Sequence, residues 1–352
     1  MDEGTAMGNG ADGANGANGA DGSAAGTVRV TIDDVARAAG VSRQTVSRAM
    51  NGKGEISAAT RRRVLATIEE LDYRPSMFAR GMRTHRAGTL GLILSDIANP
   101  FFPAVARGVF DAAAALGFSV VVHNTDAHAG RESAAAREIL ERGAEGVIGF
   151  FEALGDEELV GLHRRVPLVV ADRRAPAPGV ASVSSDFATG TRLAVEHLQA
   201  RGHRHLGMLD GAVGVDHVRR HAFTAATAPR TPVVTAPPTI TGGAAAAAQL
   251  LGEHPEVTGL FAFNDLMAVG AIRALRERGR RVPDDCAVVG YDDLTLAADL
   301  DPPLTTVHTD KYELGRTLVE VLDGVVRARR DESGAAAEHR LLPAALVVRR
   351  SG

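Results

Sequence analysis

Four residues with hydrogen-bonding side chains stand beside apolar runs, where a folded chain can hold them rigidly and still present their polar ends to a ligand. Asp172 follows the run 166–171, Asn264 the run 260–263 and Asp292 the run 288–291, and Arg219 comes shortly after the run 205–210. Carboxylate and amide oxygens accept hydrogen bonds, and a guanidinium donates several. Together they suit paired hydrogen bonds to hydroxyl groups. The sequence therefore predicts recognition of a polyhydroxylated small molecule.

The other candidates for chemistry do not assemble into a catalytic or metal site. His217 and His221 lie four residues apart, a spacing that one helix face could offer to a metal, but no glutamate follows His217 as it does in zinc proteases. The single cysteine, Cys286, excludes an intramolecular disulfide and a cysteine zinc cluster. The sequence contains no phosphate-binding loop and no serine nucleophile elbow. We therefore expect a protein that is not an enzyme and uses no cofactor.

A second set of polar and basic residues follows a helix-turn-helix pattern between residues 31 and 51. Thr31 with Asp34 matches a capping box at the start of one helix, Gly40 ends that helix, and Ser42 caps the next. In such a motif, the first turns of the second helix reach base edges in the major groove of DNA. The expected DNA contacts are Thr31, Ser42, Arg43, Gln44, Thr45, Ser47, Arg48 and Asn51.

These residue types have chemical reasons to contact DNA. Arginine binds guanine through two hydrogen bonds, glutamine does the same with adenine, and the threonine methyl group contacts that of thymine. The hydroxyl groups of Thr31 and Ser42, at helix N-termini, are expected to face phosphates. The alternative is a small helical hairpin whose basic face meets only solvent. The pattern favours DNA and leaves this alternative open.

Charge is distributed unevenly along the 352 residues, although the net charge is only −4. Residues 27–86 carry twelve Arg and Lys against six Asp and Glu, a net charge of +6. Residues 1–26 carry −4 and residues 87–352 carry −6. A basic module beside an acidic remainder fits a DNA-binding head joined to a body with a different partner. The near-neutral total is therefore no argument against nucleic-acid binding.

The elements that must position these residues fall into three regions. Residues 1–26 consist mostly of Gly, Ala, Asn and Asp, which predicts a disordered tail. Residues 27–75 hold three short helical patterns. From 88 to 349, apolar runs alternate with helical patterns in two consecutive sets, which predicts an α/β body of two lobes with parallel sheets. Because ligands in such folds bind at the carboxyl ends of strands, the four residues named first would meet in a cleft between the lobes.

The sequence resembles the lactose/galactose repressor (LacI/GalR) family along most of residues 28–349. Residues 31–83, which begin TIDDVARAAGVSRQTVSRAMNGKGE, match the family's N-terminal domain. Further matching segments follow in order: GLILSDIANPFFPAVARGV (91–109), SSDFATGTRLAVEHLQARGHRHLGML (184–209), FAFNDLMAVGAIRAL (261–275), VVGYDD (288–293) and PPLTTV (302–307). Five such segments in register with a helix-turn-helix make the resemblance specific.

The resemblance implies a cytoplasmic, ligand-controlled transcriptional regulator, expected to be a repressor that a small sugar releases from DNA. It implies a homodimer on a near-palindromic operator, with a head at 27–75, a hinge helix and linker at 76–87, and a body similar to periplasmic binding proteins. The first lobe would comprise 88–185 and 308–335, and the second 186–307 and 339–349. In relatives, each hinge helix inserts a leucine into the minor groove. Met82 stands at that position here and is also a usable apolar wedge.

The resemblance also carries over the effector site. The family's effector-binding positions match Asp172, Arg219, Asn264 and Asp292, a pocket loop matches Asp96, Phe101 and Phe102, and a contact near the lobe crossover matches Asp186. Phe101 and Phe102 could instead be core residues, and Asp186 could simply cap the following helix. Residues 227–238 are shorter than in relatives, and Thr309 replaces a longer polar side chain found in some of them. The ligand's identity therefore stays open between a sugar and a purine-like corepressor.

Two other classes of protein share an α/β body with a cleft. A solute-binding protein for transport needs an export signal and no DNA-binding head, whereas the N-terminus here lacks the basic and apolar regions of such a signal. An α/β enzyme such as a sugar kinase or dehydrogenase needs a phosphate loop or catalytic groups, and neither is found. No run of about 18 apolar residues occurs, so we expect no membrane span.

Overall fold

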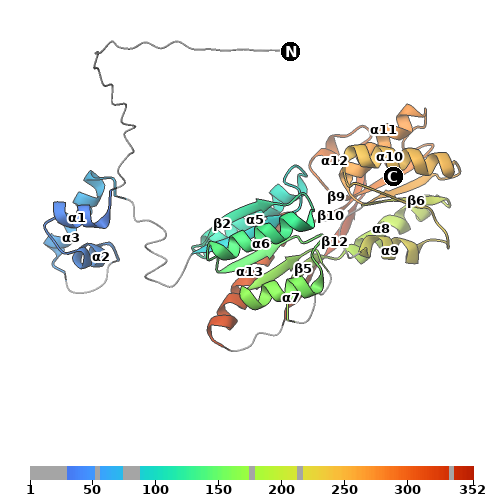
Figure 1. Ribbon diagram of the computed structural model, residues 1–352. Helices are drawn as coiled ribbons and strands as arrows, with labels where there is room; N and C mark the ends of the chain where they lie inside the picture. The colour runs from blue at the N-terminus through green and yellow to red at the C-terminus, as the bar shows by residue number, and fades with distance from the viewer. Residues whose placement is uncertain (1–29, 52–55, 74–87, 174–178, 212–216, 333–336) are drawn as a thin grey trace, which may run out of the picture. The chain divides into compact units, whose positions relative to one another are not determined.

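The computed structural model describes residues 30–51, 56–73, 88–173, 179–211, 217–332 and 337–352 (Figure 1). The chain divides into two compact units, Met1–Ser76 and Met77–Gly352, which we call the head and the body. The expected tail at 1–26 and the expected hinge helix and linker at 76–87 contain no described residue.

The described part of the head is a bundle of three helices, α1 (Ile32–Ala38), α2 (Arg43–Asn51) and α3 (Ala58–Glu70). Ser57 caps α3 by accepting a hydrogen bond from the amide of Thr60 at 3.1 Å, which satisfies one of the amides that a helix start leaves free. The buried core draws on all three helices and on the residue that ends the described segment: Val35, Ala36, Ala39, Val46, Ala49, Val64 and Tyr73.

The first lobe of the body is built on a six-stranded sheet in which every pairing is parallel. In spatial order, its strands are β11 (His339–Leu342), β5 (Ala181–Ser185), β4 (Leu168–Ala171), β3 (Gly146–Gly149), β1 (Thr89–Leu94) and β2 (Ser119–Asn124). Helices α5 (Phe101–Ala115) and α13 (Lys311–Arg330) cover one face, and α6 (Ala129–Glu141) and α7 (Asp156–Arg165) cover the other. Strands β1, β3 and β4 are accordingly apolar and almost wholly buried.

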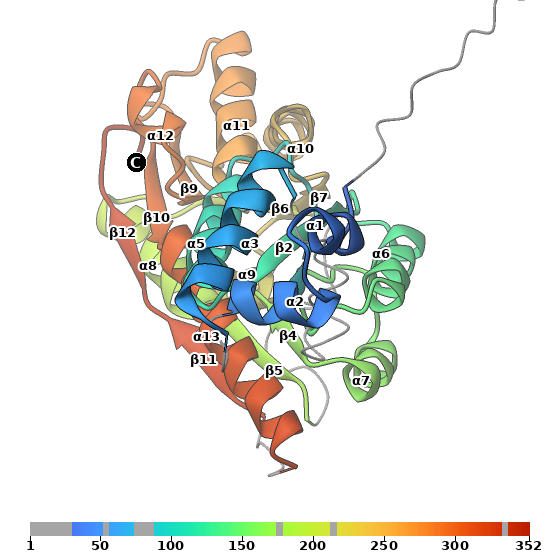
Figure 2. The ribbon, with the colours of Figure 1, turned by 90° about the vertical axis from the view of Figure 1, so that its left-hand side faces the viewer.

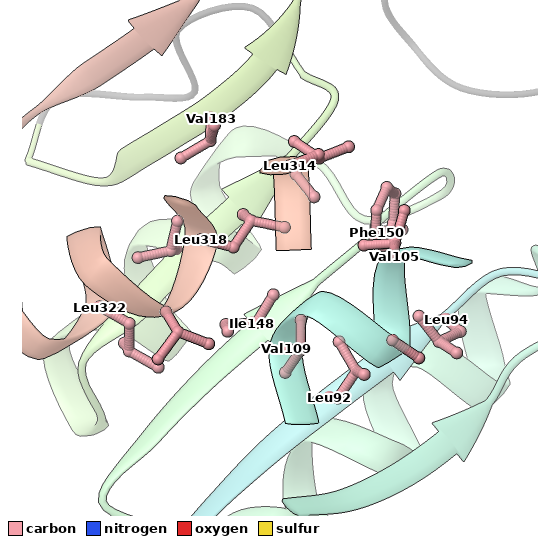
Figure 3. Packing of buried hydrophobic residues seen from close by; sticks show 14 of the residues in the cluster. Leu92, Leu94, Val105, Val109, Ile148, Phe150, Val183, Leu314, Leu318 and Leu322 are labelled. Atoms are coloured by element: carbon pink, nitrogen blue, oxygen red, sulfur yellow. The ribbon is translucent and has the colours of Figure 1, made fainter. Parts of the chain in front are cut away.

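Helices α5 and α13 pack against each other as well as against the sheet. Figure 3 shows part of the core beneath them, where Ile148 of β3 lies between leucines of α13 and valines of α5. A Cβ atom on Gly108 of α5 would lie 2.1 Å from the main-chain oxygen of Tyr312. One on Gly315 of α13 would lie 2.1 Å from that of Val105. The close approach of the two helices therefore depends on glycine at both positions.

The second lobe has its own six-stranded sheet. In spatial order, its strands are β12 (Ala344–Val347), β10 (Thr305–Thr309), β9 (Ala287–Asp292), β8 (Gly259–Ala262), β6 (Leu206–Gly211) and β7 (Val233–Ala236). Helices α10 (Ile240–Glu253) and α11 (Asp265–Glu277) cover one face, α8 (Phe187–Ala200) and α9 (Val218–Ala226) cover the other, and the short α12 (Leu296–Asp299) follows β9. All pairings are parallel except that of β12 with β10, which is antiparallel.

Three links in the described chain join the lobes: from β5 to α8, from β10 to α13, and from β11 to β12. Figure 2 shows the last of these, where the red chain runs from β11 of the first lobe into β12 of the second. Pro343 stands between these two strands and has no amide hydrogen to donate to a sheet. The two short strands can therefore join different sheets.

The structure differs from the expected lobe boundaries at both edges of the last helix. Residues 339–349 were expected in the second lobe, but β11 pairs with β5 in the sheet of the first. Residues 308–309 were expected in the first lobe, but they complete β10 of the second. A strand of four residues carries no pattern that tells which of two sheets it joins. The antiparallel β12 also makes the second sheet mixed rather than wholly parallel.

Candidate functional site

The capping box at the start of α1 is formed as the sequence predicts. The Thr31 hydroxyl accepts a hydrogen bond from the amide of Asp34 at 3.3 Å, and the Asp34 carboxylate accepts one from the amide of Thr31 at 2.9 Å. The bonds from Thr31 favour the charged carboxylate and so lower the pKa of Asp34. The chain then turns through Gly40, whose φ of +62° favours glycine. These two features fix the turn that leads into α2.

Helix α2 has one buried face and one exposed face. Val46 and Ala49 are buried in the core of the head, whereas Arg43, Gln44 and Arg48 are exposed. The residue types that can read base edges thus lie on the accessible side of the second helix of a helix-turn-helix. That is the arrangement such a motif needs to contact the major groove.

The other residues expected to contact DNA differ in what the structure shows. The hydroxyl of Ser42 accepts a hydrogen bond from the amide of Thr45 at 3.2 Å and lies 2.9 Å from the hydroxyl of Thr45, so both groups take part in capping α2. Ser47 is partly buried. Asn51 is the last residue of α2. Met82 lies outside the described residues.

The body contains a cavity of about 490 Å³ between the strand ends of its two lobes. Seven of the eight residues expected to bind an effector line it: Asp96, Phe101, Phe102, Asp172, Arg219, Asn264 and Asp292. The eighth, Asp186, is absent from the wall. Its carboxylate accepts a hydrogen bond from the amide of Thr189 at 2.9 Å and caps α8. The volume falls within the roughly 300–1,000 Å³ typical of small-molecule pockets.

Parallel strands explain why residues so far apart in sequence meet here. Strands β1, β3 and β4 of the first lobe and β6, β8 and β9 of the second all reach the cavity with their carboxyl ends, and the loops that follow these strands supply most of its wall. The cleft between lobes that the sequence predicts is therefore present, at the strand ends where α/β folds bind ligands.

Aromatic rings enclose the guanidinium of Arg219 at the start of α9. Its central carbon lies 4.2 Å from the ring centroid of Phe187, 4.0 Å from that of Phe263 and 4.7 Å from that of Tyr291. Cation–π contacts of this kind contribute about 0.5–2 kcal/mol each. The rings therefore hold the guanidinium in place, and its buried Nε is left without a hydrogen-bond partner among the described residues.

Two carboxyl groups face this cavity from opposite lobes. Asp172 follows β4 with φ +51°, and its Oδ1 accepts a hydrogen bond from the amide of Ser185 at 3.1 Å. Asp292 ends β9 with φ +101° and is only 4% exposed. Burial raises the pKa of Asp172 to about 6, and burial likewise raises the pKa of Asp292 to about 6. Arg219 opposes the rise in both cases.

Asn264 has a structural role in addition to its place in the wall. Its Oδ1 accepts a hydrogen bond from the amide of Met267 at 2.9 Å and so caps α11, while its Nδ2 donates to the oxygen of Pro238 at 3.1 Å. Phe101 and Phe102 also combine two roles. Both are buried in the core of the first lobe, and both line the cavity. The two phenylalanines are therefore both core residues and part of the cavity wall.

Sequence reasoning missed three carboxyl groups of the cavity wall. Asp126 lies just after β2 and pairs with Arg131. Glu152 follows the buried segment after β3 and accepts a hydrogen bond from the Ser95 hydroxyl at 3.0 Å, and burial raises its pKa. Asp210 lies near the end of β6, and Arg220 approaches it to 3.7 Å. All three stand at or just after strand ends, as Asp172 does. The rule that singled out Asp172 would have found them if it had been applied to every strand.

The described residues offer no group of three or more His, Cys, Asp and Glu side chains that could hold a metal ion. Within the same residues, no helix is long and apolar enough to cross a membrane. Asp265 and Asp293, beside the cavity residues Asn264 and Asp292, do not line the wall. Asp265 instead accepts hydrogen bonds within the second lobe, and Asp293 pairs with Arg349 at 2.7 Å.

Family models match both units. Residues 31–76 match the model described as bacterial regulatory proteins, lacI family, and residues 195–352 match that of a periplasmic binding protein-like domain. The ribose operon repressor of Halalkalibacterium halodurans is 36% identical over 297 residues, which cover 83% of this chain and 89% of that protein. The transcriptional repressor PurR of Photobacterium profundum is 32% identical, with 86% of this chain and 93% of that protein covered.

Solved structures resemble most of the chain. A lac repressor dimer bound to operator and the anti-inducer ONPF has a TM-score of 0.83 at 31% identity and covers 92% of this chain and 98% of its own. A complex of the transcriptional regulator CelR with cellobiose has a TM-score of 0.68 at 31% identity and covers 92% of this chain and 100% of its own. With a head that matches the family model and relatives above 30% identity along most of their length, the chain belongs to the lacI family of bacterial regulatory proteins.

Proposed function

We propose that this chain is a transcriptional repressor that binds operator DNA through its head and releases it when a small, hydroxyl-rich effector enters the cavity of its body. The observation that carries the proposal is the presence, in one chain, of an exposed basic helix in a helix-turn-helix head and a ligand-sized cavity lined by strand ends of two lobes. Relatives named as repressors and a similar structure that contains operator DNA support it.

In the head, we expect the first two turns of α2 to contact base edges. The proposed DNA contacts are Arg43, Gln44, Thr45, Ser47 and Arg48 at base edges, Thr31 and Ser42 at phosphates, and Asn51 at the end of the helix. The hydroxyls of Thr31 and Ser42 already cap helices, so their neighbouring free amides are the groups best placed to meet a phosphate.

The proposed regulator acts as a homodimer on a near-palindromic operator, in the cytoplasm, where bacterial DNA lies. The similar lac repressor structure is a dimer on its operator, and a two-fold protein matches two half-sites. In this proposal Met82 enters the minor groove as an apolar wedge that kinks the duplex.

In the body, the effector works by closing the lobes. A ligand that contacts Asp172 of the first lobe and Asp292 and Arg219 of the second binds the closed arrangement better than the open one, and this difference in affinity shifts the equilibrium. The three links between the lobes are the places where the chain must bend. The closed arrangement then disfavours the DNA-bound state of the dimer.

A purine-like corepressor is a second candidate effector, favoured by the similarity to PurR and by the aromatic rings in the wall. The two candidates change DNA affinity in opposite directions. A sugar that acts as an inducer weakens DNA binding, whereas a purine-like corepressor strengthens it. One titration of each ligand class into the protein–DNA complex separates them.

A mobility shift with the full chain tests the proposal. The probe is the DNA upstream of its own gene, and the competitor is unrelated DNA of equal length. Wild-type protein should retain the probe against the competitor, and Arg48→Ala should not. The matched control is Arg192→Ala, which removes an exposed arginine of the body that pairs with Glu196 at 2.7 Å, and it should bind as the wild type does. Equal retention of probe and competitor by the wild type would refute the proposal.

A further inference from the structure

The cavity wall contains more carboxyl groups than cations. The acidic residues of the wall are Asp96, Asp126, Glu152, Asp172, Asp210 and Asp292. The basic residues are Arg173, Arg219 and Arg220, and His217 is a further titratable group. Some of these charges are matched locally. The Arg173 guanidinium donates to Asp156, which lies outside the wall, at 2.8 Å, and Arg220 approaches Asp210 to 3.7 Å. Neither arginine is therefore free to neutralise the rest.

Three carboxyl groups of the wall share one cation, Arg219. We call Glu152, Asp172 and Asp292 the cavity carboxylates. Arg219 is the cation that lowers the pKa of all three, yet it forms no ion pair with them among the described residues, because it is stacked between aromatic rings. The cavity wall thus carries more negative than positive charge in a buried setting, where unpaired charges are costly.

The carboxylate of Asp292 lacks a hydrogen-bond donor among the described residues. The residue is only 4% exposed. The charge of Lys311 lowers the pKa of this carboxyl, but its ammonium donates to the main-chain oxygen of Asp292. The Nε of Arg219 is likewise buried and unpartnered. The wall residues thus include a carboxylate and a guanidinium that are not hydrogen-bonded to each other or, at these atoms, to any described group.

We propose that the cavity selects a hydroxyl-rich ligand that is neutral or carries a protonated amine, and that it rejects phosphorylated and carboxylated ligands. The proposal rests on the proposed function for the existence of an effector and adds its charge. A neutral polyol donates hydroxyl hydrogens to the cavity carboxylates. An ammonium group does the same and also balances their charge, so it adds affinity over the matching polyol. A phosphate would face three carboxylates with one enclosed guanidinium to receive it.

The ligand-free protein gives a first test that needs no identified ligand. In Asp292→Asn and Asp172→Asn, asparagine keeps the size of the side chain and tolerates the left-handed backbone, while the uncompensated charge is removed. We expect each variant to raise the Tm of the full chain at pH 7.5 by roughly 2–4 °C. The matched control is Asp285→Asn, which removes a carboxylate that is fully compensated by Arg281 at 3.0 Å and should lower the Tm. Lower Tm values for both cavity variants would overturn the proposal.

A series of related sugars gives the second test, by thermal shift and by release of bound DNA. The probes are glucose, glucosamine and glucose 6-phosphate, the corresponding galactose series, and ribose with ribose 5-phosphate. Amines should stabilise the protein at least as well as their neutral parents, and phosphates should stabilise it less. A phosphate that stabilises the protein more than its parent overturns the proposal. If that phosphate also releases DNA, the proposed repressor function stands while the inferred charge selection fails.

Discussion

Lys311 donates a hydrogen bond from its ammonium group to the main-chain oxygen of Asp292. The first residue of α13, a helix of the first lobe, thereby holds the end of β9 in the second lobe, at the residue whose carboxylate lines the cavity. The same ammonium donates to the oxygens of Thr309 at 3.0 Å and Asp293 at 3.3 Å. Asp292 and Asp293 both have left-handed φ values, of +101° and +51°, which cost of order 1–3 kcal/mol each. Lys311 thus stabilises a strained strand end where the chain passes between lobes.

Removal of this ammonium should loosen the strand end. Lys311→Met keeps the apolar stem but leaves three carbonyl oxygens without their donor, so we expect a loss of about 1–3 kcal/mol in the free energy of unfolding, measured by urea denaturation. Lys311→Arg keeps a cation and should recover most of the loss. It would count against this role if the methionine variant were as stable as the wild type.

Two glycines of α13 should respond to alanine in opposite directions. A Cβ atom on Gly315 meets the main chain of α5 at 2.1 Å, so Gly315→Ala should destabilise the body by about 1–3 kcal/mol or more. A Cβ atom on Gly324 meets nothing within 4 Å, so Gly324→Ala should stabilise the helix by roughly 0.5–1 kcal/mol. Thermal unfolding of both variants checks the pair. A Gly315→Ala variant as stable as the wild type would contradict the close packing of the two helices.

The pH dependence of stability should show the titration of Asp265. It accepts hydrogen bonds from the Leu294 amide at 2.7 Å and the Thr306 hydroxyl at 2.5 Å, and burial, with Asp292 nearby, raises its pKa from 3.8 to about 8. Between these pH values the folded state holds a proton that the unfolded state has lost. Stability therefore falls as pH rises towards 8, by up to about 1.4 kcal/mol per pH unit, and levels off above it.

Asp265→Asn should remove this component of the slope. Urea denaturation at pH 6, 7, 8 and 9 compares the two proteins: the wild type should lose stability more steeply than the variant from pH 6 to 8, and the two should run parallel at higher pH. Parallel curves over the entire range would mean that Asp265 does not titrate there.

Two arginines of the head should differ in how their loss affects DNA binding. Arg48→Ala should cost about 1–3 kcal/mol on the specific site and much less on unrelated DNA, because arginine at this place reads a base. Arg62 is exposed on α3, and Arg62→Ala should weaken specific and unrelated DNA alike and reduce the salt slope by about 0.9, as expected for one phosphate contact. Fluorescence anisotropy at several salt concentrations measures both. An unchanged specificity ratio in Arg48→Ala would remove its base-reading role.

Much of the fold could be predicted because its periodic patterns are local. A few adjacent residues are enough to predict the capping box of α1 and the glycine turn after it. The apolar composition of β1 and β4 is enough to predict that these strands are buried. Other strands lack such patterns. β5 contains three serines, β7 is a short edge strand, and β11 is mostly exposed. Only their partners in the sheets make them strands.

The cavity was predictable in outline and not in detail, for the same reason. Strand-end position placed Asp172, Asn264 and Asp292 at one site, since parallel strands bring their carboxyl ends together. Whether a side chain lines the cavity or hydrogen-bonds to nearby main-chain amides depends on local geometry. The spacing of residues in the sequence does not determine that geometry. Asp186 caps a helix outside the wall, and Asn264 caps a helix inside it.

The mutual effect of effector and operator on each other's binding tests the proposed coupling most directly. With a ligand found by thermal shift, fluorescence anisotropy gives the operator Kd with the cavity empty and saturated, and calorimetry gives the ligand Kd with and without operator. Linkage requires the two ratios to be equal, and we expect the ligand to weaken operator binding by roughly 5–150-fold. Operator affinity that stays the same when the cavity is saturated, or ligand affinity that operator leaves unchanged, would contradict control of the head by the cavity.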